Sequence, residues 1–194
     1  MLKVKYTTNY YEIIEKYKNF HINGTSKLSG PNTFIGYSLV KWINKIKEII
    51  LSSNSKTIID YGCGKALLYN NKINISNKTY KNIQEYWGVK EVFLYDPAVE
   101  KYSLQPSKKA DGIVCTDVIE HIPEEDVITF INNLFKFANR FVFFVIATMP
   151  ASKHFDDGRN IHLCIKTENE WKVIFSKFKE DYPDIDQYIF FNNS

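Results

Sequence analysis

The chain has 194 residues, of which 44% are hydrophobic and 24% charged, a composition typical of a globular protein with one domain. Its formal net charge of +3 is small and its lysines are scattered, which disfavours a nucleic-acid partner because a basic stripe is missing. The longest apolar run, Phe141 to Met149, is far shorter than the ~20 residues that cross a bilayer, so no membrane partner is expected.

The cysteines and the first residues indicate the compartment. Cys63, Cys115 and Cys164 are odd in number and lie far apart, so the sequence predicts neither a disulfide framework nor a paired zinc motif. Residues 1–11 lack the apolar core of a signal peptide. We therefore expect a cytoplasmic protein, whose oligomeric state the sequence leaves open.

The N-terminal part of the chain predicts two helices. Apolar side chains recur at helical spacing over residues 9–20 and again over residues 34–51, and glycines and a proline interrupt the pattern between them. We expect residues 1–55 to form a helical cap on a single domain that spans residues 1–194.

Five runs predict the strands of a sheet, and helical segments separate most of them. The strands are expected at residues 57–59, 92–95, 111–116, 141–147 and 187–191. The helices are expected at residues 66–69, 80–87, 123–138 and 168–178, with a polar interruption over 70–77. Strands that alternate with helices in this way predict an α/β fold, with a Rossmann-like, mostly parallel sheet flanked by helices.

Residues with chemical potential follow the predicted strands. In an open parallel sheet the ligand binds beyond the carboxyl ends of the strands. These ends are followed by Asp60 to Ala66, Asp96, Thr116 to His121, and Thr148 to Pro150. We therefore expect these segments to share one rim of the sheet.

The first of these segments is a glycine turn, Asp60-Tyr61-Gly62-Cys63-Gly64-Lys65-Ala66. Gly62 and Gly64 allow the backbone to approach a ligand, and amides at the start of the following helix can meet a carboxylate or another anion. Leu67 stands where a dinucleotide fingerprint would have glycine. The turn resembles the cofactor-binding turn of class I S-adenosylmethionine-dependent methyltransferases.

This resemblance implies S-adenosylmethionine as the cofactor and methyl transfer as the activity. Asp96, directly before Pro97, would accept hydrogen bonds from ribose hydroxyls, although an Asp-Pro pair by itself also fits a solvated turn. The residues expected to bind the cofactor are Asp60, Tyr61, Gly62, Gly64, Lys65, Asp96, Pro97 and Thr116.

The segment from Asp111 to Ile122 resembles the fourth-strand segment of the same superfamily, in which the pattern D-x-x-E-H is common among enzymes that methylate small molecules. Asp117 would face the reacting methyl group. Glu120 and His121 would bind substrate, act as acid and base, or tie the strand to the next helix. In the later loop, Arg159 and His162 are expected to face the substrate, so the expected catalytic residues are Asp117, His121 and His162.

Two alternatives to an enzyme for small polar acceptors stay open. A group of metal-dependent RNA 3′-end 2′-O-methyltransferases has a related E-x-x-E-H segment and a later histidine, which Asp117, Glu120, His121 and His162 would imitate. Because the first acid is Asp and the basic stripe is missing, we assign no metal. The other alternative is a regulatory protein that binds S-adenosylmethionine without catalysis.

The resemblance covers about residues 56–175 and departs from the common pattern in three places. Ala66 replaces the third glycine, and the stretch from Asp60 to Asp96 is longer than the ~20 residues typical of the fingerprint. The short interval from Asp96 to Asp111 leaves little room for the usual wall on the adenine side. The chain also stops before the usual final hairpin, so we expect a sheet trimmed at its C-terminus.

DNA bases are disfavoured as acceptors, because the sequence lacks both the D/N/S-P-P-Y/F/W tetrapeptide and a Pro-Cys nucleophile. The leading hypothesis is methyl transfer from S-adenosylmethionine to a small or medium polar acceptor.

Overall fold

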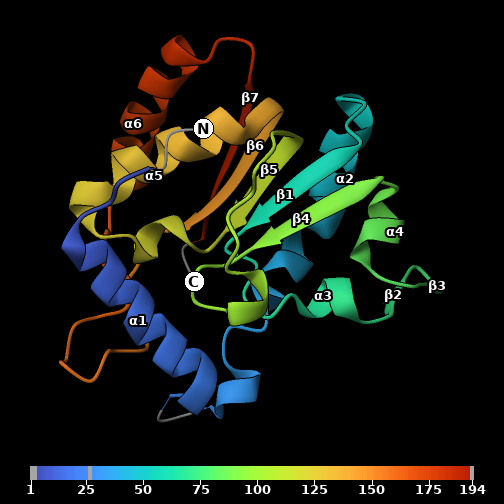
Figure 1. The fold of residues 1–194 in the computed structure, drawn as a ribbon. Helices are drawn as coiled ribbons and strands as arrows, with labels where there is room; N and C mark the ends of the chain where they lie inside the picture. The colour runs from blue at the N-terminus through green and yellow to red at the C-terminus, as the bar shows by residue number, and fades with distance from the viewer. Residues whose placement is uncertain (1–3, 26–27, 193–194) are drawn as a thin grey trace.

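A parallel sheet forms the centre of the molecule. The structure, a computed structural model, describes residues 4–25 and 28–192, and within these ranges it has one five-stranded sheet of order β4-β1-β5-β6-β7 (Figure 1). The strands are β1 (Thr57–Tyr61), β4 (Glu91–Tyr95), β5 (Ala110–Thr116), β6 (Ala138–Ala147) and β7 (Asp186–Asn192), and every neighbouring pair is parallel. The expected α/β, Rossmann-like fold is confirmed.

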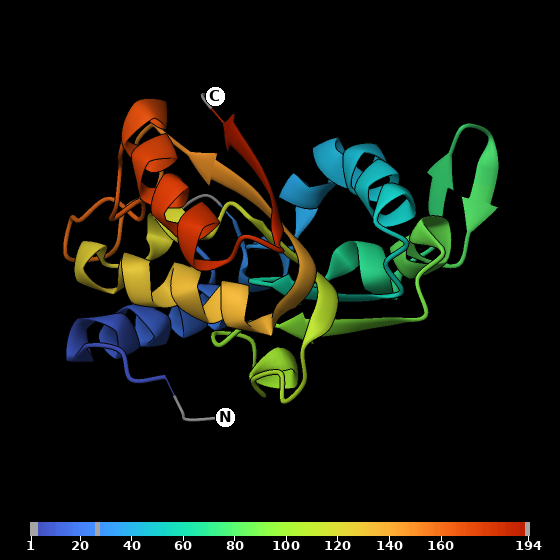
Figure 2. The same ribbon diagram turned by 90° about the horizontal axis from the view of Figure 1, so that it is seen from above.

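Helices cover both faces of this sheet. One face packs against α5 (Glu124–Phe137) and α6 (Glu168–Asp181), and the other against α2 (Ile43–Ser52) and α4 (Ile83–Trp87) (Figure 2). Residues 141–146 of β6 are therefore completely buried on both sides. Because strands buried on two faces lack a polar side, they read as continuous apolar runs, which explains why the sequence predicts them.

Local sequence signals account for the ends of the longer helices. Thr7 caps α1 (Thr8–Asn23) by accepting from the amide of Tyr10. A capping box between Thr167 and Glu170 begins α6. Three acidic residues occupy the first turn of α5, where their negative charges stabilise the helix by interacting with the positive end of its dipole.

The two helices expected in the N-terminal cap, residues 1–55, pack against different parts of the sheet. Helix α1 covers one end of the sheet, whereas Ile46, Ile49 and Ile50 of α2 belong to the core on one sheet face. The helix expected over 34–51 begins late, because a 3-10 segment, Tyr37–Trp42, precedes α2. Residues 1–3, 26–27 and 193–194, which the expected domain includes, lie outside the described residues.

The crossover from β1 to β4 contains a hairpin that the sequence does not predict. After α3 (Leu67–Asn70), strands β2 (Ile73–Ile75) and β3 (Lys78–Tyr80) pair antiparallel and project away from the sheet (Figure 2). Ser76 and Asn77 join them with φ angles of +49° and +61°. This left-handed pair is typical of a tight hairpin turn.

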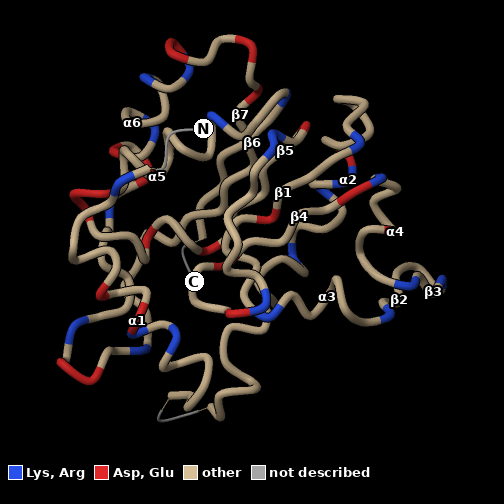
Figure 3. Tube along the Cα trace, viewed as in Figure 1, with Lys and Arg blue, Asp and Glu red and all other residues tan. Residues whose placement is uncertain are grey.

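The interval after β4 is as short as the sequence indicates. In the described residues 96–109 the only regular element is a 3-10 turn, Glu100–Tyr102. No helix in the described part of the chain is both long and apolar enough to cross a membrane. Lysine and arginine are interleaved with aspartate and glutamate along the described chain (Figure 3).

Candidate functional site

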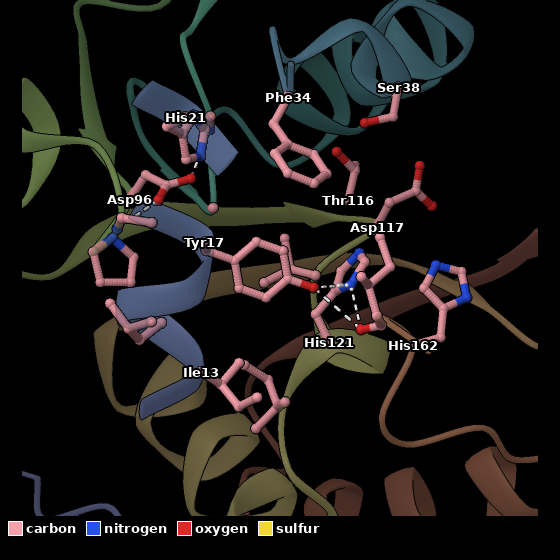
Figure 4. Close-up of a pocket in the computed structure, with 18 of the residues that line it drawn as sticks. Ile13, Tyr17, His21, Phe34, Ser38, Asp96, Thr116, Asp117, His121 and His162 are labelled. Carbon is pink, nitrogen blue, oxygen red and sulfur yellow. Dashed lines mark hydrogen bonds between the residues drawn. The ribbon is translucent and has the colours of Figure 1, made fainter. Parts of the chain in front are cut away.

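A cavity of about 390 Å³ lies at the carboxyl ends of the strands. Helix α1 and residues 34–38 line it from the N-terminal part of the chain, and residues 116–118, 121–123, 151–153 and 161–162 line it from later parts (Figure 4). The predicted site residues that line it are Tyr61, Gly62, Gly64, Asp96, Pro97, Thr116, Asp117, His121 and His162. Three of the four expected rim segments therefore contribute to one cavity, whereas the expectation for the fourth, Thr148 to Pro150, is wrong because none of its residues lines the cavity.

The two glycines of the turn are required by its geometry. Gly62 has a φ of +91°, and a Cβ there would lie 2.3 Å from Cγ2 of Val118. Gly64 has a φ of +55°, and a Cβ there would lie 2.3 Å from the carbonyl oxygen of Phe34. Side chains rarely adopt these angles and would clash here, so the backbone lies directly at the cavity wall.

The amides of the turn, in contrast, are already hydrogen-bonded within the protein. Those at the start of α3 donate to carbonyl oxygens: Lys65 N to Phe34 O (2.9 Å), Ala66 N to Cys63 O (3.0 Å) and Leu67 N to Ile35 O (3.0 Å). The expectation that these amides meet an anion is therefore wrong for this arrangement. The backbone is not helical at residues 34–36, because Phe34 and Gly36 have φ angles of +49° and +81°.

Asp96 connects the glycine turn to the segment after β4. Its Oδ2 accepts from the amide of Gly64 and its Oδ1 from the amide of Ala98, both at 2.9 Å. Burial raises the pKa of the Asp96 carboxyl, and these two hydrogen bonds oppose that rise. Since each carboxylate oxygen has two lone pairs, both can still accept a hydrogen bond from a ligand.

Two residues expected at the cofactor do not line the cavity. The Nζ of Lys65 donates to the carbonyls of Gly30 (2.5 Å) and Thr33 (2.6 Å), so its charge holds the segment before α2 in place. Asp60 is buried beneath the turn, and burial raises the pKa of its carboxyl to about 7. Both residues therefore stabilise the glycine turn from the side that faces away from the cavity.

Asp117 stands at the end of β5 in a strained conformation. Its φ is +53°, and its amide donates to the carbonyl of Val145 at 2.9 Å. Burial raises the pKa of its carboxyl, and among the described residues its Oδ1 has no hydrogen-bond partner. Figure 4 shows Asp117 beside Thr116 and Ser38 at the cavity.

His121 is held by α1 and by the loop after β6. Its Nδ1 lies 2.7 Å from the hydroxyl of Tyr17 and 2.9 Å from the carbonyl oxygen of Ile161 (Figure 4). Because a carbonyl only accepts, Nδ1 carries the proton, and Nε2 of the neutral ring keeps its lone pair. Burial lowers the pKa of His121 to about 3, and the charge of His162 contributes to this.

Glu120 and His162 complete a cluster with His121. One ligand atom from each of the three residues lies within 4.8 Å of the others. The rings of His121 and His162 are 4.8 Å apart at 77°, and Nδ1 of His162 lies 2.6 Å from the carbonyl oxygen of Met149. Glu120 is completely buried behind the cavity wall, and burial raises the pKa of its carboxyl to about 8.

Arg159 does not face the substrate as expected. Its guanidinium pairs with Asp157 at 2.8 Å and lies outside the residues that line the cavity. Sequence reasoning missed Tyr17, Phe34 and Lys153, which do line it. Tyr17 lies in a helical pattern of apolar residues, and such a pattern gives no signal that distinguishes a cavity residue from a core residue.

Comparison with known proteins assigns the chain to a family. The sequence model of a family described as a methyltransferase domain matches residues 33–178, which include the glycine turn, Asp96 and the segment from Thr116 to His162. No match to a curated protein or to a solved structure was found. The chain therefore belongs to this methyltransferase-domain family, and the resemblance to class I S-adenosylmethionine-dependent methyltransferases is confirmed.

Proposed function

We propose that the protein transfers a methyl group from S-adenosylmethionine to a small or medium polar acceptor. The observation that carries this proposal is one cavity lined both by the glycine turn with Asp96 and by Asp117, His121 and His162. Family membership supports methyl transfer in general. A cavity of about 390 Å³ falls within the ~300–1,000 Å³ common for small-molecule sites.

The residues at one end of the cavity fit the cofactor. Backbone at Gly62 and Gly64 can approach it closely, and the free lone pairs of Asp96 can accept from ribose hydroxyls. When bound there, S-adenosylmethionine supplies an activated methyl group on a sulfonium. The role of Asp96 is therefore to fix the position of the sugar.

The adenine side has a wall that comes from the N-terminal helix. The interval after β4 supplies only Pro97 and Ala98 at the cavity, and α1 adds Tyr10, Ile13 and Ile14. An apolar surface of this kind suits the faces of a purine ring. We infer that α1 takes the place of the helix and strand for which residues 97–110 have no room.

At the acceptor end of the cavity, the main task of the protein is to align the acceptor with the methyl group rather than to activate it by removing a proton. Holding the acceptor in line with the methyl group supplies much of the rate enhancement, and a base is needed only if the acceptor must lose a proton. Asp117 and the Nε2 lone pair of His121 offer hydrogen-bond acceptors there, and His162 lines the same cavity. A polar acceptor fits these groups better than an apolar one.

Calorimetry with S-adenosylmethionine and with its demethylated product tests the cofactor. We expect both to bind to the full chain, and Asp96→Ala to weaken binding by roughly 10-fold or more, because removing hydrogen bonds to charged groups costs about 1.5 to 3 kcal/mol. Glu100→Ala, in the 3-10 turn after β4, is the matched control. Absence of binding by the folded protein would refute the proposal, and unchanged affinity in Asp96→Ala would refute the ribose assignment.

Incorporation of labelled methyl groups into fractionated metabolites, protein and RNA tests the acceptor. We expect label in the small-molecule fraction. Binding without transfer to any fraction would favour a regulatory protein, and transfer confined to RNA would contradict the small acceptor.

A further inference from the structure

Lys153 places a positive charge in the wall of the cavity, and methyl transfer by itself does not use this charge. Among the described residues that line the cavity, it is the only lysine or arginine. We propose that Lys153, together with Ser152, binds a carboxylate or phosphate group of the acceptor. The inference rests on the proposed function for the role of the bound molecule, and it deepens that function by giving the acceptor a chemical class.

The ammonium of Lys153 has no anionic partner within the described protein. No carboxylate of residues 4–25 and 28–192 pairs with its Nζ, which lies 4.8 Å from the centroid of the Phe34 ring. The residue is partly buried, and this burial lowers the pKa of its ammonium. Since a charge that is withdrawn from water is usually paired, an unpaired cation in a cavity wall indicates an anion that a ligand supplies.

Backbone hydrogen bonds place Lys153 beside His121. The amide of Ile161 donates to the carbonyl of Lys153 at 3.3 Å, and the carbonyl oxygen of Ile161 lies 2.9 Å from Nδ1 of His121. The ring centroids of Phe34 and His121 each lie 5.5 Å from that of Tyr17 (Figure 4). Lys153 therefore belongs to the acceptor end of the cavity, and its charge contributes to the lowered pKa of His121.

The side chain of Asn160 fixes the shape of the loop that carries Lys153. Its Oδ1 accepts from the amides of Ala151 (3.0 Å) and His162 (2.9 Å), and its Nδ2 donates to the carbonyl of Ala151 at 2.8 Å. Ser152 and Lys153 directly follow Ala151, and both line the cavity. The backbone that carries these two side chains is therefore in place before an anion binds.

Lys153 and Ser152 offer the hydrogen-bond donors that an anion needs. An ammonium has three N–H donors and a hydroxyl has one. Neither Nζ of Lys153 nor Oγ of Ser152 has a hydrogen-bond partner in the described part of the chain, and both side chains line the cavity. Bonds from an ammonium to a carboxylate or phosphate oxygen are charge-assisted, which makes them stronger than bonds between neutral groups.

The acceptor must also fit the groups on which the proposed function depends. Asp117 and Nε2 of His121 accept hydrogen bonds, whereas Lys153 and Ser152 donate them. A molecule that satisfies both pairs has a hydroxyl or amine as the group to be methylated, and a carboxylate or phosphate separate from it. Hydroxy acids, amino acids and small phosphorylated molecules meet this description.

The methionine part of S-adenosylmethionine also has a carboxylate, so the test must separate the two sources of an anion. Asp96 marks the cofactor end of the cavity, and the lysine whose charge acts on its carboxyl is Lys65. Lys153 acts instead on His121. This difference favours the acceptor as the source.

Nuclear magnetic resonance of the full chain, titrated with inorganic phosphate or with acetate, tests the site. We expect both ions to shift the amide signals of Ser152 and Lys153, in the absence of the demethylated product of S-adenosylmethionine and at its saturation. Lys153→Ala should weaken binding of either ion by roughly 10-fold or more, and Lys153→Arg should keep most of it. Lys177→Ala, which removes an exposed lysine of α6 outside the cavity, is the matched control and should change nothing.

Absence of these shifts in the folded wild-type chain would overturn the proposal, as would equal affinity in wild type and Lys153→Ala. If the demethylated product displaces the ions and Lys153→Ala weakens its binding, the anion belongs to the cofactor and the assignment to the acceptor is wrong. The titration without cofactor gives its result even if S-adenosylmethionine does not bind. Failure of the anion site and failure of the proposed function are therefore distinguished.

The labelled small molecules provide a second test, with mass spectrometry to identify them. We expect each labelled product to contain a carboxylate or phosphate group in addition to the methylated one. Lys153→Ala should raise KM for the acceptor by roughly 10-fold or more with less change in kcat, because Lys153 binds the acceptor without contacting the reacting atoms. Labelled products that contain neither anionic group would overturn the proposal.

Discussion

At the scale of single residues, the glycine turn makes the sharpest prediction. Gly62→Ala introduces both an unfavourable φ of +91° and a contact of 2.3 Å with Val118, so we expect a loss of about 1 to 3 kcal/mol in the free energy of unfolding. Gly158→Ala is the matched control. Its φ is +83°, but the added Cβ would meet no atom of the described residues within 4 Å.

Urea unfolding of the two variants separates the two effects. Gly158→Ala should lose only the conformational part, about 1 kcal/mol, whereas Gly62→Ala should lose more and should also bind S-adenosylmethionine more weakly. Equal losses in both variants would show that the clash with Val118 is relieved by a small movement.

Asp60 makes stability depend on pH. Burial, and then the charge of Asp96, raise the pKa of Asp60 from 3.8 to about 7. The folded state therefore prefers the protonated carboxyl, so this contribution to stability is complete below pH 4 and is lost as the pH rises to about 7. We expect Asp60→Asn to be more stable than wild type at pH 8, on the order of 1 to 3 kcal/mol, and similar to it at pH 4.

Asp111 is the control with the opposite sign. Hydrogen bonds from the amides of Lys56 and Thr57 lower the pKa of Asp111 despite its partial burial. Its contribution is present at neutral pH and is lost in acid, so Asp111→Asn should be less stable than wild type at pH 8. Urea midpoints at both pH values provide the measurement. A stability difference between Asp60→Asn and wild type that is the same at pH 4 and pH 8 would contradict the assignment for Asp60.

At the scale of elements, α1 depends on a few distant bonds. The amide and hydroxyl of Thr7 donate to Asp126 of α5 at 2.9 and 2.5 Å, and Thr7 also caps the helix. We expect Thr7→Ala to cost about 1 kcal/mol and to speed amide hydrogen exchange throughout α1. Thr79→Ala, which removes one hydroxyl bond in the exposed hairpin, should leave exchange in α1 unchanged.

Exchange measured by mass spectrometry distinguishes these variants peptide by peptide. Protection of α1 that is the same in Thr7→Ala and in wild type would mean that the apolar contacts of Ile13, Tyr17 and Phe20 are enough to hold the helix.

The same elements show what the sequence could predict. Strands β1, β5 and β6 are buried on both faces, so their apolar runs were predictable, as was the glycine turn after β1. The hairpin over 73–80 was not, because strands of three residues are too short to show alternation. The role of Tyr17 was also hidden, because its partner Ile161 lies 144 positions away.

At the scale of the whole molecule, a bound ligand that contacts both α1 and the sheet should stabilise the packing of α1 on the sheet. The cavity lies between the two, so a cofactor that contacts both stabilises the folded chain by about 2.7 kcal/mol at 100 times its dissociation constant. We expect the demethylated cofactor to raise the melting temperature and to slow hydrogen exchange in α1. The hairpin over 73–80, which does not line the cavity, is the internal control. A higher melting temperature without a change in α1 would place the ligand elsewhere.

Helix α1 is bonded to residues that lie much later in the sequence, and this determines when it can dock during synthesis. Thr7 bonds to a residue 119 positions later, and Tyr17 to one 144 positions later. Helix α1 leaves the ribosome well before these partners, so it can dock only after the chain up to residue 161 has emerged. Contacts this distant form slowly, so the cavity is completed in a late step, and until then the apolar face of α1 is exposed to chaperones.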